Sequence, residues 1–387
     1  RVFIGGLLVN ALGLSACALA PSYEWLLFTR TLQGLGTALV LATAPALVTL
    51  SFSDALRPRA LGAYAMFLTG ASAVGPLAGG LLVSEWGWPA VFWYRVPIAL
   101  VAAAATFVWV QRPSIRDEHK RFDLQGAVAL SVTMVSLLLT LNRVSATGWS
   151  APTTWLLSAC AVGGLAWFAT VELKSANPVI ELRLFKNLQF SIANSANVLL
   201  QMAAFSVFLL APYFLVRYTQ GNVALAGLLL GVSPVAGAVA AMLAGRALSE
   251  ISSWALSVVG TVFVTLGLAG ISLWSPDIEL PWLIGSLVIN GIGLGLFQVA
   301  NMDYVMSALP RTQHGVAGAL TMLTRTIGVV ASATLGSVAF AELGGQFPTA
   351  GVVGERFMNA FSQVFAGAAC VALAAFTITA IAGRGTR

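Results

Sequence analysis

Hydrophobic residues occur along this chain in long runs, and polar residues gather in the short segments between them. Each run is close to or above the roughly 20 residues that a helix needs to cross about 30 Å of hydrocarbon. The runs lack the alternation of polar and apolar positions that is typical of barrel strands, so each is predicted to be a helix. We predict twelve membrane spans: Val2–Ala20, Leu26–Leu50, Ala60–Ser84, Phe92–Val110, Leu124–Asn142, Pro152–Val171, Gln189–Leu215, Asn222–Gly245, Ser253–Trp274, Pro281–Tyr304, Gly315–Val338 and Met358–Ala382.

Composition agrees with this pattern. Of the 387 residues, 58% are hydrophobic and only 9% are charged. A soluble protein of this size needs far more polar surface. The predicted fold class is therefore an all-α membrane protein with about 12 transmembrane helices.

The net charge of +6 does not indicate nucleic-acid binding, because the basic residues are scattered through short loops and form no tract. If Arg1 is placed in the cytoplasm, 14 Lys and Arg residues fall on that side of the membrane and 3 on the other. Such a bias is typical of the cytoplasmic side of the plasma (inner) membrane. We expect a multi-pass protein with both termini in the cytoplasm.

The two longest predicted cytoplasmic loops, Gln111–Asp123 and Glu172–Leu188, divide the chain into three parts. Residues 1–110 are predicted to form an incomplete bundle of four spans. Residues 111–188 would supply two linker transmembrane helices. Residues 189–387 would form a complete six-helix bundle, the size of one half of a two-half transporter.

Small residues and one proline recur in the third predicted span. They are Gly62, Ala71, Gly75, Pro76, Gly79 and Gly80. Glycines spaced four or five apart leave a groove that lets a second helix approach closely, and a proline removes a backbone donor and bends the span. The third span is therefore predicted to pack tightly and to bend.

Polar residues inside the predicted spans are the candidate functional residues, because a charge at the centre of a membrane helix costs about 2.5 to 3.5 kcal/mol on insertion scales. Arg30 and Gln33 lie one turn apart in the second span. They favour a role in transport, while the alternative is that Arg30, five residues from Trp25, extends to the membrane surface.

A stripe of amides marks the seventh span. Asn194, Asn197 and Gln201 share an arc of about 60° at helical periodicity. They could line a substrate path or form hydrogen bonds between helices, and the sequence leaves both alternatives open.

Two charged residues lie late in the chain. Asp303 is the one acid placed within a predicted span, which makes it the candidate proton acceptor, unless the helix ends near Met302 and leaves Asp303 at the interface. Arg325 lies about ten residues into the eleventh span. Its charge must pair with an acid, bind backbone carbonyls or face water. A structural role and a transport role therefore both stay open.

Three of these segments resemble the major facilitator superfamily. The segment from Gly62 to Gly80 resembles its antiporter signature G-x8-G-x3-G-P-x2-G-G, with Ala71 as the one departure. Thr29–Gly36 is close to the motif R-x-x-Q-G-x-G, and Thr321–Gly328 resembles the element N-x-x-R-x-x-G.

Two further segments narrow the resemblance to the fourteen-helix drug/proton antiporter branch, the EmrB/QacA-like group. Trp86–Ile98 resembles W-x-W-x-x-x-F-x-x-N-x-P-x, with Arg95 in place of Asn, and Asn177–Phe185 resembles P-L-[IV]-[DP]-L-x-L-F. In a twelve-helix plan the arginine and antiporter motifs belong to the fourth and fifth helices. Here they fall in the second and third spans, so we expect a fourteen-helix plan that lacks its first two helices, with the fifth and sixth spans as the extra pair.

The resemblance implies a proton-coupled exporter of amphipathic or cationic small molecules, most simply a monomer, that uses no cofactor except the proton gradient. Arg30 and Asp303 would couple transport to protons. The substrate would contact Gln33, Asn194, Asn197, Gln201 and Arg325. Two alternatives stay open: a metabolite transporter of the same fold with another substrate or direction, and a truncated membrane protein that does not transport.

An enzyme is not expected. The sequence has no pairing of a nucleophile with a base, no metal-binding motif and no phosphate-binding G-x4-G-K-[ST] loop. Its two histidines, His119 and His314, lie far apart in predicted loops.

Overall fold

The computed structural model describes residues 2–51, 64, 67, 71, 74–75, 78–110, 123–147, 151–175, 182–309, 314–345 and 354–382. Within these ranges the secondary structure is helical, without strands. The α-helices are α1 (Val2–Ala18), α2 (Tyr23–Ser51), α4 (Ala90–Trp93), α5 (Arg95–Trp109), α6 (Leu124–Thr147), α7 (Pro152–Lys174), α8 (Leu188–Tyr218), α9 (Val223–Ala247), α10 (Ser253–Ser272), α11 (Leu280–Ser307), α12 (His314–Glu342) and α13 (Glu355–Ala382). Residues 78–86 are also helical, and a short 3-10 helix, η2, spans Leu182–Lys186.

The predicted fold class is confirmed. Nine helices among the described residues are long and apolar enough to cross a membrane, and Val2–Ala18 and Leu124–Thr140 are shorter apolar helices. The fourth predicted span is split into α4 and α5 by a turn at Tyr94. The third predicted span is described only in part.

Helices α9 and α10 begin where a side chain accepts a hydrogen bond from a free backbone N–H group. Ser252 Oγ accepts from Ala255 N at 3.3 Å before α10, and Asn222 Oδ1 accepts from Leu225 N at 3.0 Å before α9. Such caps satisfy donors that have no partner within the first turn. They place the starts of α9 and α10 within one residue of the predicted spans.

Contacts divide the chain into two compact units. The first unit contains Arg1–Arg116 together with Thr219–Pro234, and the second contains Asp117–Tyr218 together with Val235–Arg387. The predicted division after residues 110 and 188 stays a prediction. Helices α6 and α7 group with the later helices. A separate linker part over residues 111–188 stays a prediction.

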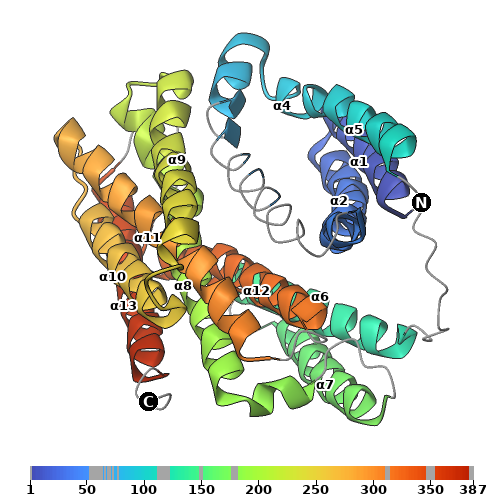
Figure 1. Cartoon of the computed structure of the whole chain (residues 1–387). Coiled ribbons are helices and arrows are strands. Elements are labelled where there is room, and N and C mark those ends of the chain that lie inside the picture. The colour runs from blue at the N-terminus through green and yellow to red at the C-terminus, as the bar shows by residue number, and fades with distance from the viewer. Residues whose placement is uncertain are drawn as a thin grey trace. The chain divides into compact units, whose positions relative to one another are not determined.

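In the first unit, α1 packs along α2 and also against α5 (Figure 1). Glycines bring the backbones together. A methyl group at Gly6 would lie 2.8 Å from Leu39 Cβ, and one at Gly13 would lie 2.6 Å from the backbone nitrogen of Gln33. Real Cβ atoms do not approach that closely, so the absence of side chains allows this helix pair to form.

In the second unit, α10 lies beside α11 and α13 (Figure 1). A methyl group at Gly260 would lie 2.7 Å from Phe297 N, one at Gly267 would lie 2.5 Å from Asn290 N, and one at Gly293 would lie 2.5 Å from Val264 N. These contacts run over more than seven residues of both helices. Small residues therefore form the α10–α11 interface along its length.

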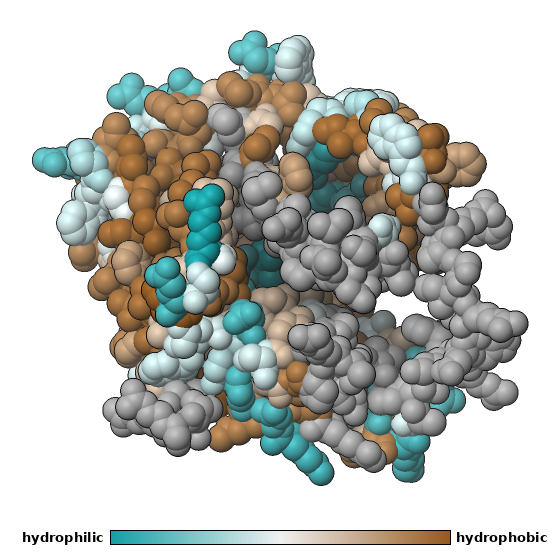
Figure 2. Space-filling view, viewed as in Figure 1, coloured by the Kyte–Doolittle hydropathy of each residue, from teal (hydrophilic) through white to brown (hydrophobic). Residues whose placement is uncertain are grey.

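Large hydrophobic side chains lie on the outside of the second unit. Val259, Leu266 and Ile289 are exposed on α10 and α11, and Figure 2 shows hydrophobic residues over much of the visible face of these helices. An exposed apolar surface of this kind is suited to lipid.

A cluster of aromatic rings joins α8 and α13 to Trp274, which follows α10. The centroid of Phe361 is 4.6 Å from that of Phe365, 5.5 Å from that of Phe214 and 5.9 Å from that of Trp274. Phe361 and Phe365 are fully buried. These separations lie within the range at which aromatic rings attract one another. The cluster therefore stabilises the packing of α13 against α8.

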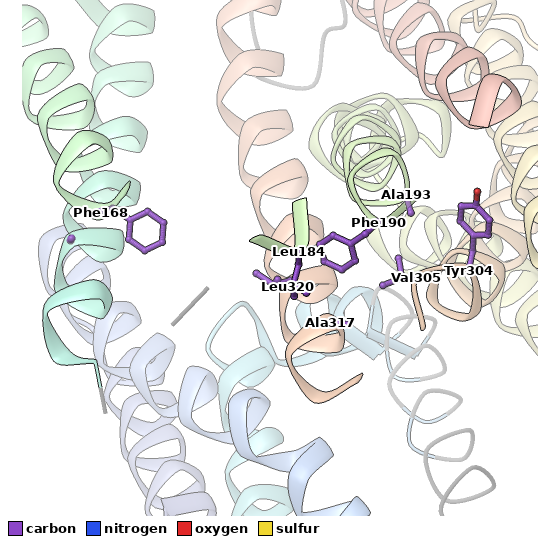
Figure 3. Packing of buried hydrophobic residues seen from close by; sticks show 9 residues of the cluster. Phe168, Leu184, Phe190, Ala193, Tyr304, Val305, Ala317 and Leu320 are labelled. Atoms are coloured by element: carbon purple, nitrogen blue, oxygen red, sulfur yellow. The ribbon is translucent and has the colours of Figure 1, made fainter. Parts of the chain in front are cut away.

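A second buried cluster joins α8, α11 and α12. Phe190 of α8 lies among Leu184, Val305 and Leu320 (Figure 3). Hydrogen bonds reinforce it, because Gln189 Nε2 donates to the carbonyl oxygen of Tyr304 at 3.0 Å and Asn187 Nδ2 donates to that of Ala308 at 3.0 Å. The start of α8 is thereby attached to the end of α11.

Asp123 caps α6 and gives a testable pH dependence. The Gly126 N–H donates to Asp123 Oδ1 at 2.8 Å, and this bond, with a further one from Ser175, holds the pKa of that carboxyl below its usual range. Because the pKa is lowered on folding, the stabilisation is present above the unfolded pKa and is lost as the pH falls through the folded one.

We expect Asp123→Ala to speed amide hydrogen exchange in the first turn of α6 at pH 7, because the cap is removed. Asp123→Asn keeps a capping oxygen, so its protection should match the wild type at pH 7 but should not fall on acidification. Equal protection in the alanine and wild-type proteins would contradict the assigned cap.

Candidate functional site

Arg30 and Gln33 belong to a network of four polar side chains in the first unit. Arg30 Nη1 donates to Gln33 Oε1 at 3.0 Å. Gln33 Nε2 donates to Asn10 Oδ1 at 3.0 Å and to Thr37 Oγ1 at 2.8 Å. The Thr37 hydroxyl lies 3.1 Å from Asn10 Oδ1 and 3.0 Å from the Gln33 carbonyl oxygen, and it has one hydrogen to share between these two acceptors. Arg30 and Gln33, both on α2, are thus connected by hydrogen bonds to Asn10 on α1.

The packing of α1 on α2 brings these groups together. A methyl group at Gly36 would overlap the backbone of Asn10, and one at Gly13 would overlap Gln33. Asn10 was missed in the sequence, where it is an uncharged residue in a run that is otherwise apolar except for Ser15. The available signal was its spacing, because Gly6, Asn10 and Gly13 lie on one helical face.

The Arg30 side chain is exposed on α2, and its Cζ lies 5.6 Å from the centre of the Phe92 ring in α4. A guanidinium over an aromatic face is attracted by about 0.5 to 1 kcal/mol at an exposed site. The arginine is therefore held by an amide on its own helix and a ring on another. Both predicted readings of Arg30, coupling and extension to the surface, are compatible with this position.

In the second unit, the amide stripe of α8 faces α12. Asn197 Nδ2 donates to the Thr321 carbonyl at 3.0 Å and lies 3.1 Å from Thr324 Oγ1, and the Thr324 hydroxyl donates to Asn194 Oδ1 at 3.0 Å. The exposed fractions of Asn194 and Asn197 are 1% and 4%. The structure thus shows the interhelical hydrogen bonds that were one of the two alternatives, and substrate contact stays a prediction.

Gln201 continues the same face of α8. It meets α12 at Gly328, where a methyl group would lie 2.9 Å from Gln201 Cβ and 2.5 Å from the Val198 carbonyl oxygen. Gln201 Nε2 is buried and has no hydrogen-bond partner among the residues that the structure describes. One turn before Gly328, Arg325 is half-buried on α12 beside Thr324. Gln201 thus contacts the helix that carries Arg325, and both side chains carry hydrogen-bond donors.

Asp303 lies within α11, four residues before the helix ends at Ser307, and its side chain is exposed. Tyr304, the next residue, is instead buried in the cluster of Figure 3. The helix thus continues past Met302, which was the condition for counting Asp303 within a span. Its role in proton coupling stays a prediction.

The antiporter-like segment is described only in part, and Gly62 and Pro76 lie outside the described residues. Gly80 makes the close approach that its spacing predicts: a methyl group there would lie 2.9 Å from the Val223 carbonyl oxygen and 3.2 Å from Gly227 Cα, both in α9. No described atom lies within 4 Å of such a group at Gly75 or Gly79. Ala71 is exposed.

Apolar helices, glycine-mediated packing and polar groups within the spans define a polytopic helical membrane protein. The sequence matches the Major Facilitator Superfamily over residues 1–333. This chain belongs to that superfamily, and with its bacterial relatives it is a multi-pass protein of the plasma membrane.

Similar proteins include drug-resistance transporters. The chain is 29% identical over 345 residues to the multidrug resistance protein Stp of Mycobacterium tuberculosis, covering 89% of this chain and 64% of that protein. It is 30% identical over 364 residues to the multidrug efflux pump LfrA of Mycolicibacterium smegmatis, covering 92% of this chain and 70% of LfrA. The chain thus spans slightly less than two thirds of the length of Stp.

A solved structure shares the fold. A POT family transporter in complex with a thioalcohol-conjugated peptide superposes with a TM-score of 0.69 at 15% identity, covering 100% of this chain and 82% of that one. This likeness concerns the fold alone.

Proposed function

We propose that this transporter exports amphipathic or cationic small molecules in exchange for protons and follows the fourteen-helix drug/proton antiporter plan. The observation that carries the proposal is the network in which Arg30, within a membrane helix, donates to Gln33, which is bound in turn to Asn10 and Thr37. A charge in this setting is costly and is typically retained for function. Similarity to Stp and LfrA supports the substrate class.

In this proposal the protein alternates between two states, each of which opens the substrate site to one side of the membrane. Arg30 and Asp303 couple the exchange to protons, and no other cofactor is required. Gln33, Asn194, Asn197, Gln201 and Arg325 contact the substrate. Helices α6 and α7 are the extra pair of the fourteen-helix plan, both termini face the cytoplasm and the protein acts as a monomer.

The test uses inverted membrane vesicles that contain the full-length protein and a fluorescent amphipathic cation. An imposed proton gradient, acidic inside, should drive the cation into the vesicles, and a protonophore should abolish the movement. Vesicles without the protein provide the control. Cation movement that is unaffected by the protonophore would contradict proton coupling, and no movement above the control would favour the non-transporting alternative.

A further inference from the structure

We infer that Asn10 is a positioning residue, which holds Gln33 and, through it, Arg30 in the orientation that proton coupling requires. The inference rests on the proposed function and extends it to a residue of α1. It follows from the juxtaposition of Asn10, Gln33 and Arg30 across the α1–α2 interface.

The chemistry of Arg30 determines how the Gln33 amide faces. A guanidinium has only donors, so the group that Gln33 turns toward Arg30 must be its oxygen, Oε1. The amide nitrogen then points the opposite way. Its two hydrogens are taken by Asn10 Oδ1 at 3.0 Å and Thr37 Oγ1 at 2.8 Å.

Asn10 supplies the acceptor that completes this arrangement. Its Oδ1 accepts from Gln33 Nε2 at 3.0 Å and lies 3.1 Å from the Thr37 hydroxyl, which also lies 3.0 Å from the Gln33 carbonyl oxygen. Of the three side chains bound to Gln33, Asn10 is the one that comes from another helix. Without Asn10, the Gln33 nitrogen would keep only Thr37, one turn further along its own helix.

Close packing holds Asn10 in register with Gln33. Gly36 lies against the backbone of Asn10, and Gly13 lies against the backbone of Gln33, with a methyl group at Gly13 only 2.6 Å from Gln33 N. Asn10 is half-buried, so water has limited access to replace its oxygen. A movement of α1 along α2 would therefore turn Gln33 and change the support of Arg30.

The experiment compares Asn10→Leu, which removes the acceptor at similar size, with Asn10→Asp, which keeps an acceptor oxygen. Initial rates of proton-driven cation transport are measured in vesicles and normalised to folded protein. For Asn10→Leu we expect kcat to fall about five- to tenfold, the size expected for one buried hydrogen bond, with little change in KM. Asn10→Asp should transport faster than Asn10→Leu, because an acceptor for Gln33 Nε2 persists.

Ser15→Ala is the matched control, because the Ser15 hydroxyl also lies on α1 but donates only to the Ala11 carbonyl of its own helix, at 3.0 Å. It should leave kcat unchanged. Adding Asn10→Leu to Arg30→Ala should cause no further loss if Asn10 acts through Arg30, because residues that act as a unit are not additive.

Two results would overturn the inference while leaving the proposed function intact. One is an Asn10→Leu protein that is less stable but transports at the wild-type rate per folded molecule. The other is a full additional loss when Asn10→Leu is combined with Arg30→Ala. If instead the wild type itself shows no proton-driven transport, the proposed function fails and the inference fails with it.

Discussion

Replacing Arg30 by alanine is expected to lower proton-driven transport about tenfold or more without reducing the amount of folded protein. The guanidinium is exposed, so its removal leaves no cavity in a core. What is lost is the charged donor to Gln33 Oε1 and the contact with the Phe92 ring. A hydrogen bond to a charged group contributes about 1.5 to 3 kcal/mol, which corresponds to a tenfold or larger change in rate.

The measurement is the initial rate of cation movement in vesicles as a function of the imposed pH difference. Arg30→Lys keeps the positive charge but loses the planar fork of donors, so it should give an intermediate rate. Asp303→Asn tests the second coupling residue in the same assay. Unchanged transport in both Arg30→Ala and Asp303→Asn would remove the coupling roles assigned to these residues.

Replacing Gly267 by leucine is expected to prevent α10 from packing on α11. A Cβ atom at this position would lie 2.5 Å from Asn290 N and 2.6 Å from Asn290 Cα. Because the opposing atoms belong to the backbone, no side-chain rotation can relieve the overlap. We expect a loss of about 3 kcal/mol or more, at or above the upper end of ordinary overpacking.

The measurement is the fraction of monodisperse protein after detergent extraction, together with the midpoint of thermal unfolding. Gly285→Leu is the matched control: it lies on α11, and no described atom stands within 4 Å of a methyl group there. It should extract and unfold like the wild type. Equal behaviour of the two leucine variants would show that the α10–α11 approach does not limit folding.

The helices were predictable because hydrophobic length is a local property of the chain. The eleventh span was predicted over Gly315–Val338, and α12 covers His314–Glu342. The split of the fourth span at Tyr94 was not predicted, although Arg95 and Pro97 follow that turn.

The candidate site was predictable only in part. Periodicity placed Asn194 and Asn197 on one face of a helix, yet it could not identify Thr321 and Thr324 as their partners, which lie more than 120 residues away. Asn10 carries no charge, and the other polar side chain of α1, Ser15, donates only to the carbonyl oxygen of Ala11 in its own helix. The contact of Asn10 with Gln33 arises only when glycines bring α1 and α2 together.

The sequence by itself determined that this protein is built of membrane helices and which polar residues they carry. In lipid each helix satisfies its own backbone hydrogen bonds, so a sufficiently long apolar run is enough to specify one. The tertiary structure alone decided which helices meet and which polar side chains bind one another. Lipid is as apolar as the helix surfaces, so association depends on close fit at small residues and on hydrogen bonds between particular side chains.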